Sequence, residues 1–201
     1  MKEVAKTLLD IQAVSLSPNF SFTWASGIQA PVYCDNRLLL SYPDQRKLII
    51  EAFINEIKNN YPDVEVLAGT ATAGIPHAAF LAHELNLPMV YVRSKPKEHG
   101  KQNLIEGKLT KGAKVLVIED LISTGKSSLQ VVNALKAEAV SVMGVLSIFT
   151  YDLLSAKNAF QMADCNYKSL TNFKELLEVA REQDILNAND LEKIYTWTQS
   201  M

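Results

Sequence analysis

The chain has 201 residues, of which 48% are hydrophobic and 21% charged, a composition typical of a globular protein with one real core. Its 20 Lys and Arg against 22 Asp and Glu give a net charge of −2, which argues against a general nucleic-acid-binding protein. No apolar stretch reaches the roughly 20 residues needed to span a membrane, and the N-terminus lacks the apolar segment of a signal peptide. Cys34 and Cys165 form neither a C-x-x-C nor a zinc spacing, so we predict reduced thiols in a cytoplasmic protein.

The first predicted elements are a helix, an irregular stretch and a second helix. Apolar residues at 4, 8, 11 and 14 predict a helix from Val4 to Val14. From Phe20 to Tyr33, aromatic residues alternate with small and hydroxylic ones, which indicates an irregular segment or a hairpin. Asp44 follows a proline and is the predicted cap of a helix whose apolar face runs from Leu48 to Ile57.

Strands then alternate with helices. The predicted strands are Val64 to Ala68, Met89 to Arg93, Lys114 to Ile118 and Val140 to Phe149, with helices starting near Pro76 and covering Ser128 to Ala137. Such alternation predicts an α/β fold with a mostly parallel central sheet flanked by helices. Helical patterns over Phe173 to Glu182 and Leu191 to Trp197 close the chain. We predict one domain, 1–201, with a small N-terminal cap over residues 1–40 and a core from 41 to 201.

The segment from Val115 to Ser128 carries the clearest chemical signal. Its apolar strand is followed by two acids, Glu119 and Asp120, and then by a loop of small hydroxylic residues with one glycine. In a parallel sheet, ligands bind beyond the carboxyl ends of the strands. The backbone N–H groups of such a loop, at the start of a helix, suit a phosphate. The carboxylates repel a phosphate but accept hydrogen bonds from hydroxyls, so the segment predicts a site for a phosphorylated sugar.

Other readings of this segment are less favoured. An ordinary polar turn does not account for two consecutive acids followed by Ser-Thr-Gly-Lys-Ser-Ser. A nucleotide-binding P-loop needs a glycine five positions before Gly125, where Asp120 stands. No G-x-G-x-x-G follows any predicted strand, so a dinucleotide site has no support.

A second informative segment runs from Arg93 to Lys101 and holds four basic residues and one histidine in nine positions. Most charge runs are solvated loops, but this one lies in a long connection between two strands. Cations there can stabilise negative charge on phosphate oxygens, and closure of the segment would exclude water from a bound sugar phosphate. Mg²⁺ held mainly by the oxygens of the substrate would assist, and no protein metal ligand is predicted.

The acidic segment resembles the phosphoribosyl pyrophosphate (PRPP) signature of the type I phosphoribosyltransferases. The resemblance implies that Glu119 and Asp120 contact the ribose hydroxyls and that the loop after them cradles the 5-phosphate. The residues it assigns to PRPP in this segment are Glu119, Asp120, Leu121, Ile122, Ser123, Thr124, Gly125, Lys126 and Ser127.

The basic segment, Arg-x-x-x-Lys-x-His-Gly, is similar to the catalytic loop of the orotate phosphoribosyltransferases. The resemblance implies that Arg93, Lys97 and His99 bind PRPP, and that Lys97 and His99, with Asp120, are catalytic. In that family the loop reaches into the neighbouring subunit's site, which implies a homodimer. Lys95 lies in the same loop and is a weaker candidate.

A third segment, Phe-Thr-x-x-Ser-Gly-x-x-x-Pro from residue 22, resembles the start of the base site in that family. It implies that Ser26, Gly27 and Tyr33, together with Ser123, contact orotate. The turn at 69–76 matches the family's pyrophosphate-side loop. Many members carry lysines where Ala25 and Ala73 stand, and an arginine that would meet the orotate carboxylate near residues 150–152 is not evident. Arg37 is one candidate for that cation.

Taken together, the resemblance implies transfer of 5-phosphoribosyl from PRPP to N1 of orotate, with Mg²⁺, giving orotidine 5-phosphate and pyrophosphate in pyrimidine biosynthesis. Two alternatives stay open: a phosphoribosyltransferase for another base, and a non-catalytic PRPP-sensing regulator on the same fold. A regulator would not need an intact basic loop, so the Lys97→Ala substitution separates it from an enzyme.

Overall fold

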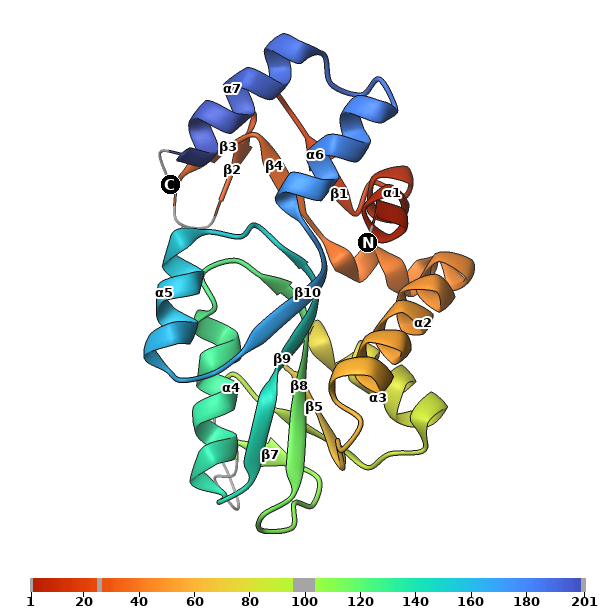
Figure 1. Cartoon of the computed structure of the whole chain (residues 1–201), viewed down its shortest axis with the longest axis vertical. Coiled ribbons are helices and arrows are strands. Elements are labelled where there is room, and N and C mark those ends of the chain that lie inside the picture. The colour runs from red at the N-terminus through yellow and green to blue at the C-terminus, as the bar shows by residue number, and fades with distance from the viewer. Residues whose placement is uncertain (1, 25–26, 96–103, 200–201) are drawn as a thin grey trace.

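The centre of the molecule is a parallel sheet (Figure 1). The computed structural model describes residues 2–24, 27–95 and 104–199, and over these ranges six strands pair in the order β10-β9-β8-β5-β6-β7. Their bounds are β5 Val66–Thr70, β6 Met89–Val92, β7 Ile105–Glu106, β8 Lys114–Ile122, β9 Ser141–Thr150 and β10 Tyr167–Asn172. Only β7 pairs antiparallel among these described strands, so the predicted mostly parallel sheet is confirmed.

Helices cover both faces of the sheet (Figure 1). On one side lie α2 (Pro43–Asn60) and α3 (Gly74–Leu85), and on the other α4 (Lys126–Ala137) and α5 (Leu154–Met162). The side chains of β8 alternate between two hydrophobic clusters, as a strand buried on both faces requires. Leu116 and Ile118 pack on the α2 and α3 side, while Val115 and Val117 pack on the α4 side.

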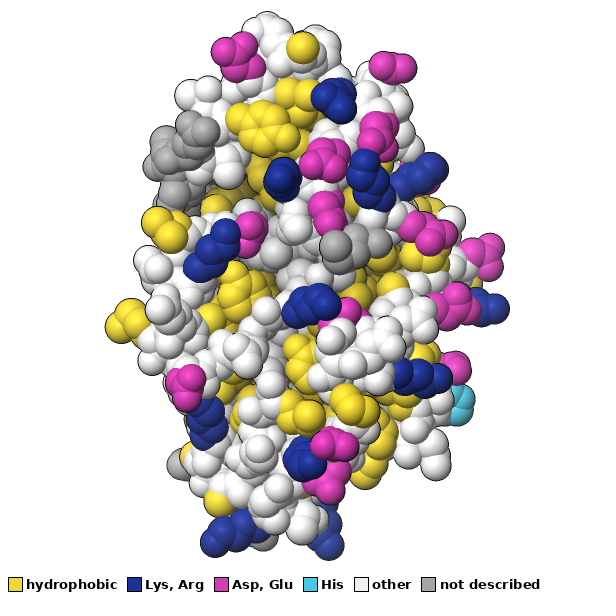
Figure 2. Space-filling view, in the orientation of Figure 1, with side chains coloured by type: hydrophobic (Ala, Val, Ile, Leu, Met, Phe, Trp, Pro, Cys, Tyr) yellow, Lys and Arg dark blue, Asp and Glu magenta, His cyan; other side chains and the backbone are white. Residues whose placement is uncertain are grey.

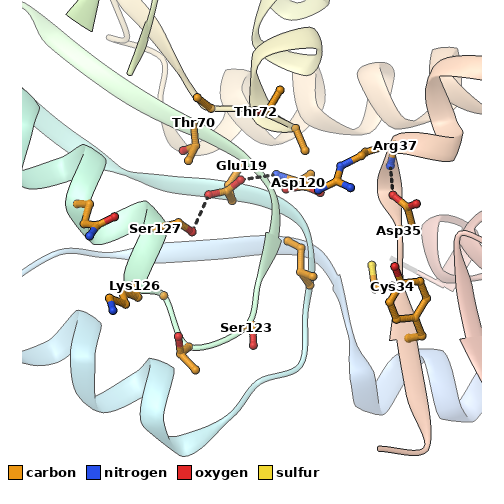
Figure 3. Close-up of a pocket in the computed structure, with 17 residues that line it drawn as sticks. Cys34, Asp35, Arg37, Thr70, Thr72, Glu119, Asp120, Ser123, Lys126 and Ser127 are labelled. Atoms are coloured by element: carbon orange, nitrogen blue, oxygen red, sulfur yellow. Dashed lines mark hydrogen bonds between the residues drawn. The ribbon is translucent and has the colours of Figure 1, made fainter. Parts of the chain in front are cut away.

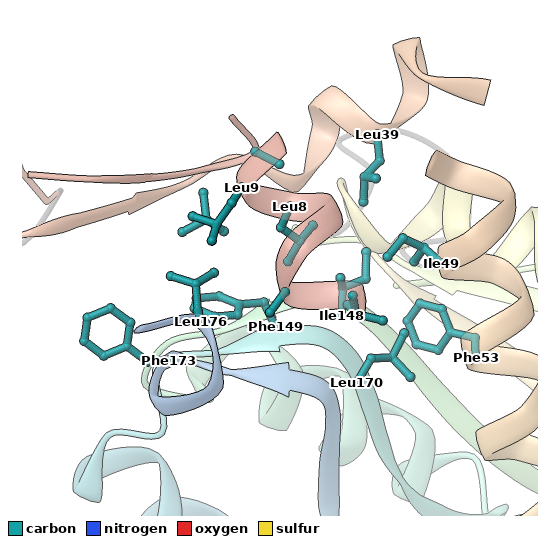
Figure 4. Packing of buried hydrophobic residues seen from close by; sticks show 14 of the residues in the cluster. Leu8, Leu9, Leu39, Ile49, Phe53, Ile148, Phe149, Leu170, Phe173 and Leu176 are labelled. Carbon is teal, nitrogen blue, oxygen red and sulfur yellow. The ribbon is translucent and has the colours of Figure 1, made fainter. Parts of the chain in front are cut away.

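A smaller group of elements lies beyond the carboxyl ends of the central strands. It contains α1 (Lys2–Asp10), β1 (Val14–Leu16), β2 (Phe22–Thr23), β3 (Gln29–Ala30), β4 (Val32–Cys34), the 3₁₀ helix η1 (Asn36–Ser41), α6 (Phe173–Glu182) and α7 (Ala188–Gln199). We call this group the cap. Figure 4 shows Leu8 and Leu9 of α1 facing Leu176 and Phe173 of α6. The indole of Trp197 donates to the carbonyl of Gln29 at 3.1 Å, so the last helix closes over the first hairpin.

Several predicted boundaries are wrong. The first helix ends at Asp10, because Gln12 takes a φ of 56° and Val14 already begins a strand. Asp44 is not the cap of α2: Tyr42 holds that position and Pro43 begins the helix, which leaves Asp44 in the first turn. The strand of the acidic segment does not stop at Ile118 but continues to Ile122.

The helix after the acidic segment begins at Lys126, two residues earlier than predicted. Gly125 precedes it with a φ of +77°, and a Cβ at this position would lie 2.6 Å from the Phe160 ring. Both facts favour glycine, which reaches this backbone conformation without steric cost. Helix α5 and strand β10, which the sequence patterns did not indicate, complete the second face and one edge of the sheet.

None of the helices in the described ranges is long and apolar enough to cross a membrane. On the face shown in Figure 2, basic and acidic side chains are interspersed, in keeping with the small net charge of −2.

Candidate functional site

A cavity of about 520 Å³ opens at the carboxyl ends of β5 and β8, between the sheet and the cap (Figure 3). Parallel sheets bind their ligands at this edge. The cavity is lined by Tyr33, Cys34, Asp35, Arg37, Thr70, Ala71, Thr72, Ala73, Glu119, Asp120, Leu121, Ser123, Thr124, Gly125, Lys126, Ser127 and Gln130.

Glu119 lies on the α4 side of β8 and is 4% exposed. Its carboxylate accepts hydrogen bonds from the hydroxyl of Ser128 at 3.1 Å and from that of Ser127 at 3.4 Å. The backbone N–H of Asp120 donates to its other oxygen at 3.1 Å. Burial, followed by the charge of Asp120, raises the pKa of Glu119 well above its usual value. Burial, beside a second carboxyl group, therefore disfavours the charged form of Glu119.

Asp120 follows on the opposite face, because successive side chains of a strand alternate. Its charge acts on Cys34 of the cap and on His77 of α3, which places it on the cap and α3 side. Its backbone carbonyl accepts a hydrogen bond of 2.7 Å from the side-chain amide of Asn36. Glu119 and Asp120 therefore line the same cavity but are held by different elements. Glu119 is held by serines of α4, and the backbone of Asp120 is held by Asn36 of the cap.

The loop after β8 leads directly into the N-terminus of α4. Ser123, Thr124 and Gly125 line the cavity, and Lys126 is the first residue of the helix. The first N–H groups of a helix have no partners within the helix, and the helix dipole is positive there. This end of the cavity therefore suits a phosphate group, with the Lys126 ammonium adding positive charge.

The opposite wall of the cavity is the turn from Thr70 to Ala73, between β5 and α3. It packs tightly, since a Cβ on Gly74 would lie 2.5 Å from the carbonyl oxygen of Ile118. The Thr70 hydroxyl is buried and has no hydrogen-bond partner among the described residues. None of the four side chains of this turn is charged, and the guanidinium of Arg37 lines the same cavity.

A second cleft, of about 450 Å³, adjoins the first. It is lined by Thr23, Trp24, Ile28, Tyr33, Cys34, Leu121, Ser123, Thr124, Tyr151, Leu153 and Ser155, five of which also line the first cavity. The rings of Trp24 and Tyr151 lie 4.7 Å apart between centroids. Among its described lining residues there is no Lys, Arg or His. An apolar cleft with aromatic walls and a few hydroxyls suits a flat heterocycle.

Comparisons with known proteins agree with this geometry. Residues 39–174 match the phosphoribosyl transferase domain family. The chain is 52% identical over 200 residues to the orotate phosphoribosyltransferase of Staphylococcus haemolyticus, covering 100% of this chain and 99% of that protein. The chain belongs to the orotate phosphoribosyltransferase family. It is 55% identical to the Bacillus subtilis member over 197 residues, which cover 98% of this chain and 91% of that one.

Among solved structures, the orotate phosphoribosyltransferase of Aeropyrum pernix superposes with a TM-score of 0.78 at 26% identity. The match covers 92% of this chain and 99% of that one, so the fold of the family extends through both the sheet and the cap.

The structure brings most of the residues predicted from the family motifs to one place. Glu119, Asp120, Leu121, Ser123, Thr124, Gly125, Lys126, Ser127 and Tyr33 all line the first cavity. Ile122 does not, because its side chain is buried in the core on the α4 side. Gly27 lines neither cavity and lies in an exposed turn with a φ of +84°.

Arg93 lies at the end of β6 and lines a neighbouring cavity of about 400 Å³, which shares Thr70, Ala71, Ser127 and Gln130 with the first. Its guanidinium lies 3.6 Å from the carboxylate of Glu106. Lys97, His99 and Ser26 lie outside the described residues. The basic loop therefore stays a prediction for its two central members.

Several residues that line or support the site were not predicted from the family motifs. Trp24 and Tyr151 come from distant segments and form an aromatic wall only when the cap lies on the core. Asn36 supports Asp120 from behind, which no local pattern indicates. The sequence pattern that indicates this packing is the alternation of aromatic residues between Phe20 and Tyr33, which is typical of a segment that packs against the rest of the protein.

Proposed function

We propose that this chain transfers the 5-phosphoribosyl group of PRPP to N1 of orotate, giving orotidine 5-phosphate and pyrophosphate. The observation that carries the proposal is the pair Glu119 and Asp120, which faces one cavity together with the N-terminus of α4. A phosphate bound at the helix and hydroxyls bound at the carboxyl groups are the two functional parts of a phosphorylated pentose. The identity of 52–55% over nearly full length to named members of the family supports orotate as the acceptor.

Each part of the cavity has a chemical task in this proposal. The N–H groups around Gly125 and Lys126 bind the 5-phosphate, and the two carboxylates hold the ribose hydroxyls. The turn from Thr70 to Ala73 offers backbone donors to the diphosphate. Arg37, the sequence-based candidate for the cation at the orotate carboxylate, lines this cavity and not the second cleft, so we place its charge beside the diphosphate instead. When the bond from C1 to the diphosphate oxygen breaks, the electron pair leaves with the diphosphate. The Asp120 carboxylate stabilises the positive charge that develops on the sugar ring, while Glu119 mainly holds the hydroxyls.

The adjoining cleft is the proposed acceptor site. Trp24 and Tyr151 offer aromatic surface to a planar base, and the hydroxyl of Ser123 lies where the cleft meets the first cavity. N1 of the acceptor then points toward C1 of the sugar, where it forms the new bond to C1 and gives up its proton to the departing diphosphate. Tyr33 lines both spaces and separates the base from solvent on the cap side.

The residues of the cavity fit a Mg²⁺ ion that is held mainly by substrate oxygens. Two carboxylates and the unpartnered hydroxyl of Thr70 line the cavity, while no cluster of three or more acidic, His or Cys side chains occurs among the described residues. Mg²⁺ commonly takes one or two carboxylates and completes its shell with phosphates and waters. When bound, it would neutralise charge on the diphosphate. The basic loop, with Arg93, Lys97 and His99, is proposed to bind the same group.

The proposal is tested by following the loss of orotate absorbance with PRPP and Mg²⁺. Uracil, hypoxanthine and adenine serve as alternative acceptors in parallel reactions. We expect turnover with orotate at least about 100-fold above that with the other bases. Faster turnover with another base would assign a different acceptor, and binding of PRPP with no turnover of any base would favour a PRPP-sensing regulator.

We further propose a homodimer in which the basic loop of one subunit serves the site of the other. The position of Arg93 supports this, since it lines a neighbouring cavity and not the one that holds the two acids. The cytoplasmic location stays a prediction. The sequence-based division into an N-terminal segment at 1–40 and a core at 41–201 also stays a prediction, and it differs from the structural cap, which includes α6 and α7.

A further inference from the structure

Asn36 makes a contact that joins the cap to the acidic pair. It is the first residue of η1, it is fully buried at 0% exposure, and its side-chain amide donates to the backbone carbonyl of Asp120 at 2.7 Å. The two residues lie 84 positions apart in the sequence. Asn36 does not line the cavity, so the effect of this hydrogen bond on a bound ligand would pass through Asp120.

The pairing of the sheet explains why this carbonyl needs a partner. Strand β5 pairs with β8 only as far as Gly69 and Ile118, whereas β9 continues beside β8 to Ile122. Beyond Ile118, β8 is an edge strand on the side of β5, so its backbone N–H and C=O groups on that side have no hydrogen-bond partner in a neighbouring strand. The N–H of Asp120 is taken by the carboxylate of Glu119, and the carbonyl is taken by Asn36.

Asn36 is itself held in place. The carboxylate of Asp35 accepts a hydrogen bond from the N–H of Arg37 at 3.2 Å, and the N–H of Asp35 donates to the carbonyl of Ala13 at 2.7 Å. Leu39, one turn further along η1, is fully buried in the main core. The donor therefore comes from a rigid support, as the positioning of a reactive group requires.

We propose that Asn36 is a positioning residue that fixes the peptide after Asp120, and with it the direction of the Asp120 carboxylate toward the ribose hydroxyls. The proposal rests on the proposed function. The amide of Asn36 supplies the hydrogen bond that β5 would have supplied if it continued, so the acidic pair can lie at an open strand edge without losing its geometry. The same bond makes the position of the acids depend on docking of the cap.

The test is a double-mutant cycle with Asn36→Leu and Asp120→Asn. The first change removes the donor with little change in volume, and the second removes the carboxylate charge but keeps the backbone. Asn36→Leu alone should lower kcat/KM for PRPP about 10- to 100-fold. In the Asp120→Asn background, the same change should lower it less than about threefold, because the group it positions is already altered. An equal loss in both backgrounds would overturn the proposal.

Controls separate positioning from stability. Thr171 is also buried and makes a side-chain hydrogen bond of 2.8 Å, to Glu175, away from the cavity. Thr171→Val should lower the melting temperature without changing kcat/KM for PRPP. If Asn36→Leu does not fold, the double-mutant cycle is repeated with Asn36→Asp, whose side chain has the same size but lacks the amide donor. Failure of both variants to fold would show a folding residue and overturn the proposal.

The same four proteins of the double-mutant cycle are also compared by the dissociation constant of PRPP, which is measured by calorimetry without any acceptor. If the wild type binds PRPP but does not consume orotate, the proposed function fails while the binding cycle still decides the role of Asn36. Non-additive losses in PRPP affinity support positioning, and additive losses contradict it.

Discussion

Glu119 and Asp120 are neighbours in sequence and differ in their surroundings. Glu119 is nearly fully buried, its pKa is raised, and it accepts bonds from two serine hydroxyls and a backbone N–H. Asp120 is only partly buried and lies on the other face of the strand. A strand that places consecutive side chains on opposite faces thus gives two identical functional groups different electrostatic environments.

This difference predicts unequal effects of neutralising the two acids. Asp120→Asn removes the charge that can support the sugar in the transition state, and we expect kcat to fall about 100-fold or more. Glu119→Gln should cost at least about tenfold less, because burial raises the pKa of Glu119 and disfavours its charged form. Steady-state kinetics with PRPP varied at saturating orotate measures both. Equal losses would contradict the difference in environment.

His77 gives a prediction for the dependence of stability on pH. Burial, opposed by the charge of Asp120 and reinforced by that of Arg46, lowers the pKa of His77 to about 4. In the unfolded chain it titrates near 6.5, so between these values the unfolded state binds more protons and stability falls as pH falls. The free energy of unfolding should drop by about 2 kcal/mol from pH 7 to pH 5 through this residue alone.

The measurement is urea unfolding of the wild type and of His77→Gln at pH 7 and pH 5. Other groups, including Glu119, titrate in both proteins, so only the difference between the two slopes reports His77. A variant that loses as much stability as the wild type over this range would show that His77 is not held neutral.

At the scale of elements, the sequence indicated the centre of the sheet well and its edges poorly. Strands β5, β6, β8 and β9 have continuous apolar runs, and such runs can be recognised without knowledge of their neighbours. Strand β10 reads Tyr-Lys-Ser-Leu-Thr-Asn and is a strand because β9 pairs with it. Pairing of this kind is a tertiary effect that local propensity does not contain.

The continuation of β8 through the acids was missed for the same reason. Two charged residues end an apolar pattern, yet β9 keeps pairing with β8 as far as Ile122 and Thr150. The acids were nevertheless placed at the correct edge of the sheet, because that inference needs only the direction of the strand. Asn36, Trp24 and Tyr151 could not be placed at all, since each reaches the site from a distant segment.

The packing of α3 against β8 gives a prediction at this scale. A Cβ on Gly74 would lie 2.5 Å from the Ile118 carbonyl oxygen, so Gly74→Ala must push the helix and the preceding turn away from β8. We expect a loss of about 1–3 kcal/mol in stability and a higher KM for PRPP, with a smaller change in KM for orotate. Gly112→Ala is the control, because Gly112 has a φ of +82° but open space around it and does not line the cavity. If both variants shift KM for PRPP equally, the turn is not specifically displaced.

At the scale of the whole molecule, the site is assembled from both ends of the chain. The hairpin of β2 and β3 and the last helix, α7, lie together beyond the carboxyl ends of the sheet (Figure 1), and the aromatic rings of Trp24, Tyr151 and Trp197 lie in one cluster. The acceptor cleft therefore exists only when the cap is folded onto the core. We expect the two parts to unfold in one cooperative transition, since they share a single hydrophobic cluster.

The proposed sharing of loops between subunits can be tested by mixing two inactive variants. Lys97→Ala lacks the loop cation, and Asp120→Asn lacks the acid. In a mixed dimer, one of the two sites receives an intact loop and keeps an intact acidic pair. Mixing equal amounts after partial denaturation and refolding should restore about a quarter of wild-type activity, because half of the dimers are mixed and each has one working site. No recovery would mean that each subunit's loop serves its own site.

The two tryptophans of the chain lie together, with ring centroids 5.6 Å apart, and one of them, Trp24, forms a wall of the acceptor cleft. The protein thus carries an intrinsic optical reporter. A planar base stacked on this indole should quench its emission, and Trp197→Phe would leave Trp24 as the sole tryptophan, which can be excited selectively over the seven tyrosines. Titrating orotate into that variant while recording fluorescence would follow occupancy of the cleft directly, without a label and before any chemistry takes place.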